Sequence, residues 1–251
     1  MRSTLSRRAA TAAALCAAAA LGLTACQGKG GDSAKDSPSA GDTASSASTG
    51  APSATTAAAR PLLTGTELTR ALAPDAMFPA GFAVDPSATQ DTGGDYQATG
   101  DTHPAKPDCA KLQTNAWIAI TGLTGVSFTQ QDRVDKARTA EIDQEIDVFK
   151  GGTAATAMER IGAVGAACPS FLDSDTRSKV TVTEKPLTGI GDGAYVITLT
   201  SPRWQSGTTL IAARVGTAVV TVLSGDDSGH DGRVTAEKVA RHIAGQLKGK
   251  A

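Results

Sequence analysis

Aromatic residues and histidines are scarce in this sequence, and a second long apolar stretch is missing. Phe, Trp and Tyr together make up 4% of the 251 residues, and there are three histidines. The hydrophobic core must therefore be built mainly from Val, Ile, Leu and Ala. After the first 25 residues, no apolar stretch reaches the length that a membrane-spanning helix needs.

Known catalytic motifs and a basic stripe are missing as well. The chain contains no G-x-S-x-G, H-E-x-x-H or P-loop pattern. Without residues 1–25, which hold three of the 24 Lys and Arg and none of the 25 acids, the formal charge is −4 (21 minus 25). We therefore expect no nucleic-acid partner, no cofactor and no enzymatic activity. Two alternatives stay open: an envelope hydrolase with a dispersed carboxylate site, and a structural envelope protein.

The first 26 residues have the layout of a bacterial lipoprotein leader. Three arginines within the first eight residues precede an apolar stretch rich in Ala and Leu that ends at Leu23. The sequence Leu-Thr-Ala-Cys over residues 23–26 resembles the lipobox. That resemblance implies cleavage before Cys26, attachment of diacylglyceryl and palmitate to it, and a lipid anchor on the extracytoplasmic face of the cell membrane. The alternative is an ordinary cleavage site at which Cys26 is incidental.

Residues 27–60 form a segment of extreme composition. They contain no Val, Ile, Leu, Met or aromatic residue and consist mainly of Ala, Ser, Thr, Gly and Pro. Such a segment cannot bury enough apolar surface to offset the entropy of ordering it. We therefore expect a signal peptide over 1–25, a disordered linker over 26–60 and one folded domain over 61–251. As a flexible coil the linker reaches roughly 30 Å.

The four cysteines divide between these parts. Cys16 is removed with the leader and Cys26 carries the lipid, which leaves Cys109 and Cys168 as an even pair in an oxidising compartment. A disulfide between them is worth about 4 kcal/mol in the chain-entropy model. Zinc is the alternative ligand, but two cysteines without a CxxC pattern or a nearby pair of histidines make a poor site. The sequence favours the disulfide.

The periodicity of the folded part predicts an α+β domain. Thr64 and Glu67 form a capping box that begins a helix, and further helices are expected from residue 153 to Cys168 and from Thr235 onward. Strands are predicted near residues 126–129 and over 140–149, 179–184, 194–200, 208–215 and 217–223. Residues 74–107 have few apolar anchors and are predicted to form a loop. The expected fold is an antiparallel sheet with helices packed on one face and one disulfide.

The predicted strand over residues 140–149 alternates strictly between apolar and acidic side chains. One face carries Ile142, Gln144, Ile146 and Val148, and the other carries Glu141, Asp143, Glu145 and Asp147. We expect the acidic face to be solvated. The alternative is that this row of carboxylates attracts a cation or a basic partner.

Other segments hold residue types that are common in functional sites. Asp101, His103 and Asp108 lie in the predicted loop, and Asp226, Asp227, His230 and Asp231 lie in another. Nothing near the first group provides the rigid frame that metal ligands need, and the spacing of the second group matches no calcium-binding loop. We therefore expect no metal in either segment. Residues 189–193 are rich in glycine, but they lie between two strands and open no helix, which favours a turn over a phosphate loop. Trp204 lies at a hairpin tip and either folds back on the sheet, which is favoured, or stands at the rim of a groove.

The order of these features resembles the PknH-type extracellular domains. Cys109 follows a Pro-rich stretch, and an extended segment, the strand that ends at Phe149, a helix rich in Gly and Ala, and Cys168 come after it. Such domains are the sensors of actinobacterial receptor kinases and also occur alone in lipoproteins. The resemblance implies a groove and a non-catalytic sensing or ligand-binding role. Members commonly carry a second disulfide, for which this chain has no cysteines. An envelope lipid, glycan or protein is the expected ligand, and its binding residues stay unknown.

Cys26→Ala is expected to abolish lipid attachment, because the Cys26 thiol is the group that the lipoprotein pathway modifies. Cells grown with labelled palmitate should label the wild-type chain and not this variant, which stays unprocessed or is released into the medium. Cys16→Ala is the matched control and should keep the label, since Cys16 is removed with the leader. Unchanged membrane association of the Cys26 variant after removal of its leader would contradict the anchor.

Overall fold

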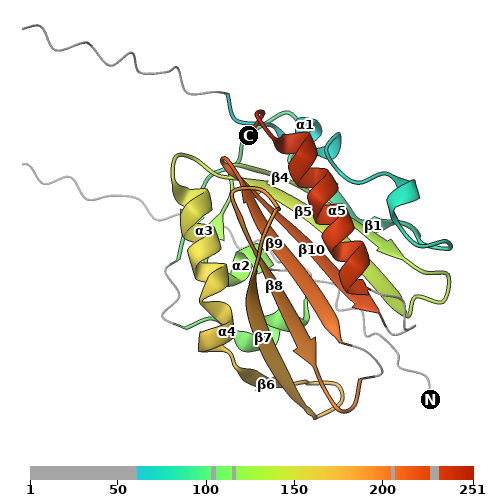
Figure 1. Cartoon of the computed structure of the whole chain (residues 1–251). Helices are drawn as coiled ribbons and strands as arrows, with labels where there is room; N and C mark the ends of the chain where they lie inside the picture. Colours follow the sequence, from blue (N-terminus) through green and yellow to red (C-terminus); the bar gives the residue numbers. More distant parts are fainter. Residues whose placement is uncertain (1–60, 103–105, 115–116, 205–206, 227–231) are drawn as a thin grey trace, which may run out of the picture. The chain divides into compact units, whose positions relative to one another are not determined.

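The computed structural model describes residues 61–251 except 103–105, 115–116, 205–206 and 227–231 (Figure 1). The leader, Cys26 and the linker lie outside the described residues. The helices are α1 (Gly65–Thr69), η1 (Asp75–Met77), η2 (Cys109–Gln113), α2 (Trp117–Ile120), α3 (Thr153–Gly162), α4 (Val164–Ala167) and α5 (Gly232–Leu247). The strands are β1 (Ala83–Asp91), β2 (Gly100–Asp101), β3 (Leu123–Thr124), β4 (Ser127–Val134), β5 (Ala140–Val148), β6 (Ser170–Leu172), β7 (Lys179–Leu187), β8 (Gly193–Thr200), β9 (Thr208–Val215) and β10 (Ala218–Asp226). In the part of the chain described here, no helix is long and apolar enough to cross a bilayer.

Eight strands form one antiparallel sheet in the order β1-β4-β5-β10-β9-β8-β7-β6. β5 and β10 pair along their whole length, from Ala140 opposite Asp226 to Val148 opposite Ala218. The turn between β9 and β10 contains Gly216 at φ 57°, a conformation that side chains disfavour. The predicted α+β class, the antiparallel sheet and the hairpin over residues 208–223 are therefore confirmed.

Helices cover both faces of the sheet, so the prediction that they pack on one face was wrong. α5 lies across one face against β9 and β10, and α3 packs on the same two strands from the other side (Figure 1). The reason can be read in the central strands. In β9, Ile211 and Ala213 belong to the core under α5, whereas Leu210 and Ala212 belong to the core under α2 and α3. A strand that is apolar on both faces needs a cover on both.

The prediction that residues 74–107 form a loop was also wrong, because β1 occupies the edge of the sheet beside β4. Pro86 lies inside this strand, where the register between Val84 and Thr89 shifts. Proline cannot donate to a ladder, so it is tolerated at an edge or a bulge. Because the segment contains this proline and few apolar residues, its sequence did not predict a strand.

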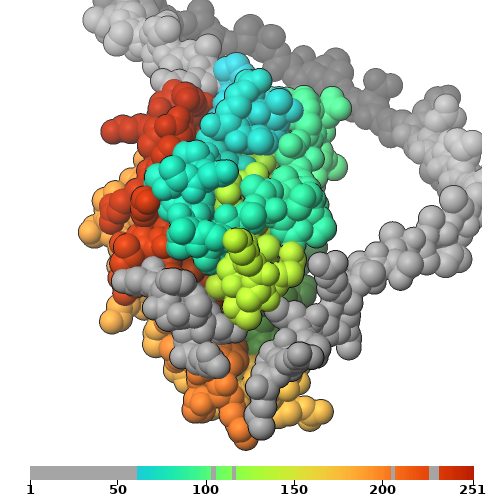
Figure 2. Space-filling model, turned by 90° about the vertical axis from the view of Figure 1, so that its right-hand side faces the viewer, coloured from blue at the N-terminus to red at the C-terminus, as the bar shows by residue number. Residues whose placement is uncertain are grey.

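The N-terminal part of the domain is fixed to the α5 face by polar contacts. The capping box is confirmed, since Glu67 accepts from the backbone amide of Thr64 at 2.8 Å while the Thr64 hydroxyl accepts from the amide of Glu67. Farther along, the Ala73 amide donates to the side-chain oxygen of Gln144 in β5 at 2.9 Å. Arg133 of β4 pairs with Asp75 at 2.8 Å on this same side. Figure 2 shows the teal N-terminal part of the domain beside α5 in red.

The disulfide between Cys109 and Cys168 is present, as the cysteine count predicts. Cys109 begins η2, and Cys168 follows α4 with its side chain buried in the core under α2 and α3. Their Cα atoms lie 5.6 Å apart. The bond therefore ties the segment that leads into α2 to the end of the α3–α4 layer.

Trp204 folds back from its hairpin tip onto the same core, which confirms the favoured interpretation. Its indole N–H donates to Asp173 at 2.6 Å. Burial alone would raise the pKa of Asp173, but hydrogen bonds from Thr176, Trp204 and the amide of Asp175 outweigh it and lower the pKa to about 2. The ionised form of Asp173 thus holds the tip in place.

Asp173→Asn should destabilise the domain near neutral pH and much less near pH 2. A carboxyl whose pKa falls on folding contributes stability above its unfolded pKa, and this contribution is lost as the pH falls through the folded value of about 2. We expect a loss of about 2 kcal/mol in the free energy of unfolding at pH 7, measured by urea titration. Asp175→Asn, at the exposed neighbouring acid, is the control. An equal loss at pH 7 and pH 2 would contradict the assignment.

Candidate functional site

The loop acids singled out in the sequence do not assemble into a site within the described part of the chain. Asp101 pairs with Arg160 of α3 at 2.9 Å, and Asp108 caps η2 by accepting from the amide of Ala110 at 3.2 Å. His103, Asp227, His230 and Asp231 lie outside the described residues. The glycines between β7 and β8 form a turn, as predicted.

The acidic row of β5 faces the α2 side of the sheet and is largely buried, so the expectation of a solvated face was wrong. Asp143 and Asp147 are each 5% exposed and Glu145 is half-buried, whereas Glu141 remains exposed. The apolar row of the same strand lies in the core under α5 and α1. The alternation along β5 was predicted from the sequence, but not the cover on its acidic side.

The neighbouring strand β4 adds a further carboxylate to this row. Asp132 lies directly opposite Asp143 in the β4–β5 pair, and Gln130 lies opposite Glu145. The Gln130 amide donates to Asp132 at 3.0 Å. One carboxylate oxygen from each of Asp132, Glu141 and Asp143 lies within 4.8 Å of the other two. This group is called the acidic triad below.

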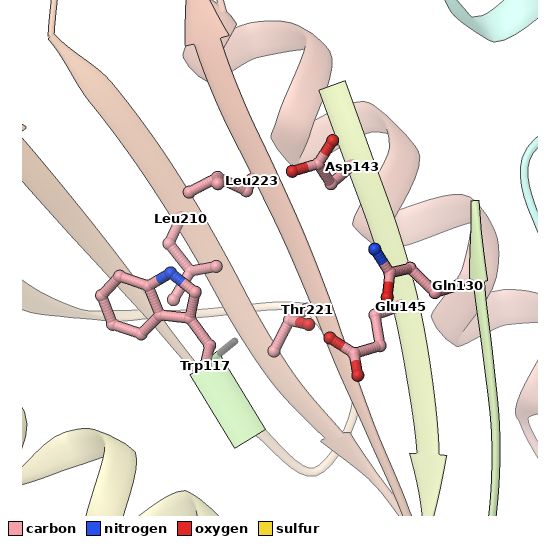
Figure 3. A pocket seen from close by; sticks show the side chains of 7 residues that line it. All are labelled: Trp117, Gln130, Asp143, Glu145, Leu210, Thr221 and Leu223. Atoms are coloured by element: carbon pink, nitrogen blue, oxygen red, sulfur yellow. The ribbon is translucent and has the colours of Figure 1, made fainter. Parts of the chain in front are cut away.

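A small cavity adjoins the acidic triad (Figure 3). Its volume is about 10 Å³, which is room for about one water molecule. The lining residues come from α2, β4, β5, β9 and β10, and they are Trp117, Gln130, Asp143, Glu145, Leu210, Thr221 and Leu223. Figure 3 shows the Asp143 and Glu145 carboxylates on the same side of β5, toward β10 and Trp117.

Burial dominates the electrostatics of these carboxyl groups. It raises the pKa of Asp132 to about 6, against a hydrogen bond from Gln130 that lowers it. The pKa of Asp143 is raised well above its ordinary value by burial first and by the charges of Asp132 and Glu141 next. Burial also raises the pKa of Asp147 to about 7, although a hydrogen bond with Glu145 opposes the shift. Each of these groups is therefore costly to keep ionised without a compensating charge.

Three buried polar atoms around the row have no hydrogen-bond partner in the described structure. They are Oδ1 of Asp143, Oδ2 of Asp147 and Nε1 of Trp117. Unsatisfied polar atoms are uncommon in protein interiors and are often found where a water or an ion binds. The indole N–H and the Asp143 carboxylate both belong to residues that line the cavity.

A larger groove lies on the same side of the sheet, beside α3. Its volume is about 380 Å³, at the lower end of the range for small-molecule sites. It is lined by residues of α3, the end of β7, the start of β8 and the end of β9, which are Ala155, Met158, Glu159, Pro186, Leu187, Gly193, Ala194, Tyr195 and Arg214. We call it the α3 groove.

Two contacts give the α3 groove a defined shape. A Cβ atom on Gly162 of α3 would lie 2.6 Å from the ring of Tyr195, so any other residue at this position would displace the ring. Arg214 is held by Asp192 at 3.3 Å and by the carbonyl of Gly216 at 3.3 Å. The groove thus combines an apolar floor with one positioned guanidinium. Sequence reasoning missed both Tyr195 and Arg214, which carry no motif.

The comparison with known proteins supports the fold alone. No family model matches the sequence, and no curated protein resembles it closely enough to count as a relative. Among solved structures, the chain is similar to the extracellular domain of PknH from Mycobacterium tuberculosis, with a TM-score of 0.51 and 11% sequence identity. The match covers 75% of this chain and 98% of that one. The chain thus has a fold similar to that of this extracellular domain.

Asp147→Asn should flatten the pH dependence of stability. The folded pKa of about 7 lies above the unfolded value of 3.8, so between these values the folded state holds a proton that the unfolded state releases. This group therefore makes the wild type less stable as the pH rises from 4 to 7. Relative to wild type, the variant should gain a few kcal/mol on going from pH 4 to pH 8 in urea unfolding.

The exposed Asp95 provides the control for this experiment, because Asp95→Asn changes the same functional group at the surface. Its unfolding free energy should follow that of the wild type at every pH. A difference between wild type and Asp147→Asn that stays constant from pH 4 to pH 8 would contradict the raised pKa.

Proposed function

We propose that the chain is a lipid-anchored, extracytoplasmic binding domain that recognises an amphipathic envelope molecule in the α3 groove and catalyses no reaction. The α3 groove is the observation that carries this proposal. The fold similarity to an extracellular domain and the lipoprotein-like leader support the proposed location outside the cytoplasm.

The lining of the groove fits a ligand with an apolar body and an anionic or zwitterionic head. Met158, Leu187 and Tyr195 offer apolar contact, and Arg214 offers N–H groups beyond the Nη1 that binds Gly216 and Asp192. A guanidinium that is already held in place loses little freedom on binding an anion. Glu159 at the same groove favours a head group that also carries a donor or a positive charge.

The proposed anchor is consistent with such a ligand. Lipid on Cys26 and a linker that reaches roughly 30 Å would keep the domain near the membrane surface. Two acyl chains would hold it there durably, whereas a single chain binds reversibly. The domain would then sample molecules of the envelope without entering the bilayer.

The hydrolase alternative finds less support in the geometry. Asp143 and Glu145 are the carboxylates that share a cavity, but its volume of about 10 Å³ admits about one water molecule. A glycosidase needs room for a sugar ring between its two carboxyl groups. The binding proposal therefore rests on the α3 groove and not on the acidic row.

Ala155→Trp should weaken ligand binding, because Ala155 is exposed on α3 and lines the groove, so that a large ring there fills the space. The probe is an anionic lysophospholipid below its micelle concentration, titrated by calorimetry. Wild type should bind it saturably, Ala155→Trp at least 10-fold more weakly, and Arg214→Gln about 10-fold more weakly.

Ala166→Trp is the matched control, because Ala166 is an exposed alanine on α4 outside the groove lining. It should bind like the wild type. Equal affinity in both tryptophan variants, or no saturable binding by the wild type, would contradict the proposed groove.

A further inference from the structure

We propose that the acidic triad, Asp132, Glu141 and Asp143, binds one divalent cation, Ca²⁺ in preference to Mg²⁺. This site is separate from the α3 groove and does not depend on the function proposed for it.

The backbone holds the triad in a fixed arrangement. Asp132 and Asp143 are directly opposite each other on β4 and β5, and Glu141 precedes Asp143 by two residues on the same face of β5. Like charges directly opposite each other destabilise a sheet. Two inner strands that place three carboxylates together therefore need a positive charge or protons between them.

The spacing of the oxygens suits a single ion. One oxygen from each residue lies within 4.8 Å of the other two. A Ca²⁺ ion about 2.4 Å from its ligands can join oxygens up to about 4.8 Å apart. Mg²⁺ is smaller, demands near-ideal octahedral geometry and is usually bound through one or two carboxylates with several water molecules, not by a cage of protein ligands. A group of three carboxylates therefore favours Ca²⁺ over Mg²⁺.

Two buried polar atoms without hydrogen-bond partners point to a ligand at this site. Asp143 is 5% exposed, and its Oδ1 has no hydrogen-bond partner in the described structure. In Figure 3 its carboxylate stands on the cavity side of β5. The Trp117 N–H in the same lining is also unpartnered and is 1% exposed. A cation with one nearby water would satisfy a buried acceptor and a buried donor together.

The nearby arginines Arg133 and Arg138 form their ion pairs with acids outside the triad. Arg133 alternates to the opposite face of β4, where it pairs with Asp75 and lies 4.3 Å above the ring of Phe78. Arg138, in the hairpin between β4 and β5, binds Asp85 and interacts with Glu141 through its charge alone. The exposed Glu141 leaves one side of the triad open to solvent, through which an ion can enter. Carboxylate oxygens are the ligands that a hard cation such as Ca²⁺ prefers.

The fluorescence of Trp117 provides a direct test, because this residue lines the cavity next to Asp143. The full-length protein carrying Trp204→Phe, purified in detergent and freed of metal with EDTA, is titrated with Tb³⁺. Sensitised terbium emission should rise to saturation and be displaced by Ca²⁺ with a dissociation constant of about 10⁻⁴ to 10⁻³ M, the range of extracellular calcium modules. Mg²⁺ should displace at least 10-fold less effectively.

Asp143→Asn separates binding from folding. This change removes a buried charge at constant shape, so the metal-free variant should melt no lower than the wild type. Saturating Ca²⁺ should raise the melting temperature of the wild type by several degrees and leave the variant unchanged. Asp95→Asn, at an exposed acid, should respond like the wild type. Equal Ca²⁺ responses in wild type and Asp143→Asn, or no response up to 10 times the expected dissociation constant, would overturn the site. Equal displacement by Mg²⁺ would overturn the ion preference.

Discussion

Side chains alternate along β5 between an apolar row under α5 and an acidic row under the layer that holds α2 and α3, and the acidic triad depends on this alternation. β5 is an inner strand bonded to β4 on one side and β10 on the other, so its register is fixed over its whole length. A slip by one residue would put four carboxylates into the core under α5. The packing of Ile142, Ile146 and Val148 therefore determines the face of β5 on which the acidic side chains lie, whatever free energy the burial of those side chains costs.

The disulfide and Trp117 close the acidic side. Cys109 is bonded to Cys168, and η2 leads from it into α2, whose first residue is the fully buried Trp117. This cover withdraws Asp143 and Asp147 from water and raises their pKa. Replacing such a group by an apolar residue of similar size is often neutral or stabilising. A row of several buried acids is thus a poor device for stability, and a role in binding accounts for it better.

Local signals in the sequence were sufficient to predict most helices, strands and turns. They did not predict which faces of the sheet are covered in the folded chain. The capping box at Thr64 and Glu67 and the turn glycine Gly216 each act within a few residues, so their sequence patterns predict the structure directly. The disulfide was predicted by counting the cysteines that remain after the leader and the lipid-modified cysteine are set aside. By contrast, β1 takes its conformation from pairing with β4, and Pro86 hides it. The burial of Asp143 depends on Trp117, 26 positions earlier in the sequence, and alternation alone cannot reveal whether a polar face is covered. The α3 groove was beyond prediction for the same reason, since Tyr195 and Arg214 meet α3 only in the folded chain.

The α3 groove and the acidic row lie on one face of one sheet, and their separation on it decides how they influence each other. Leu210 lines the small cavity and Arg214 lines the groove, and both project from the same side of β9 with Ala212 between them. Four residues of strand separate these positions by about 13 Å, and the acidic triad lies farther away still, on β4 and β5 beyond β10. Substitutions farther apart than about 10 Å usually have additive effects. We therefore expect substitutions in the acidic triad to change binding in the α3 groove little, so the two proposed sites can be tested independently of each other.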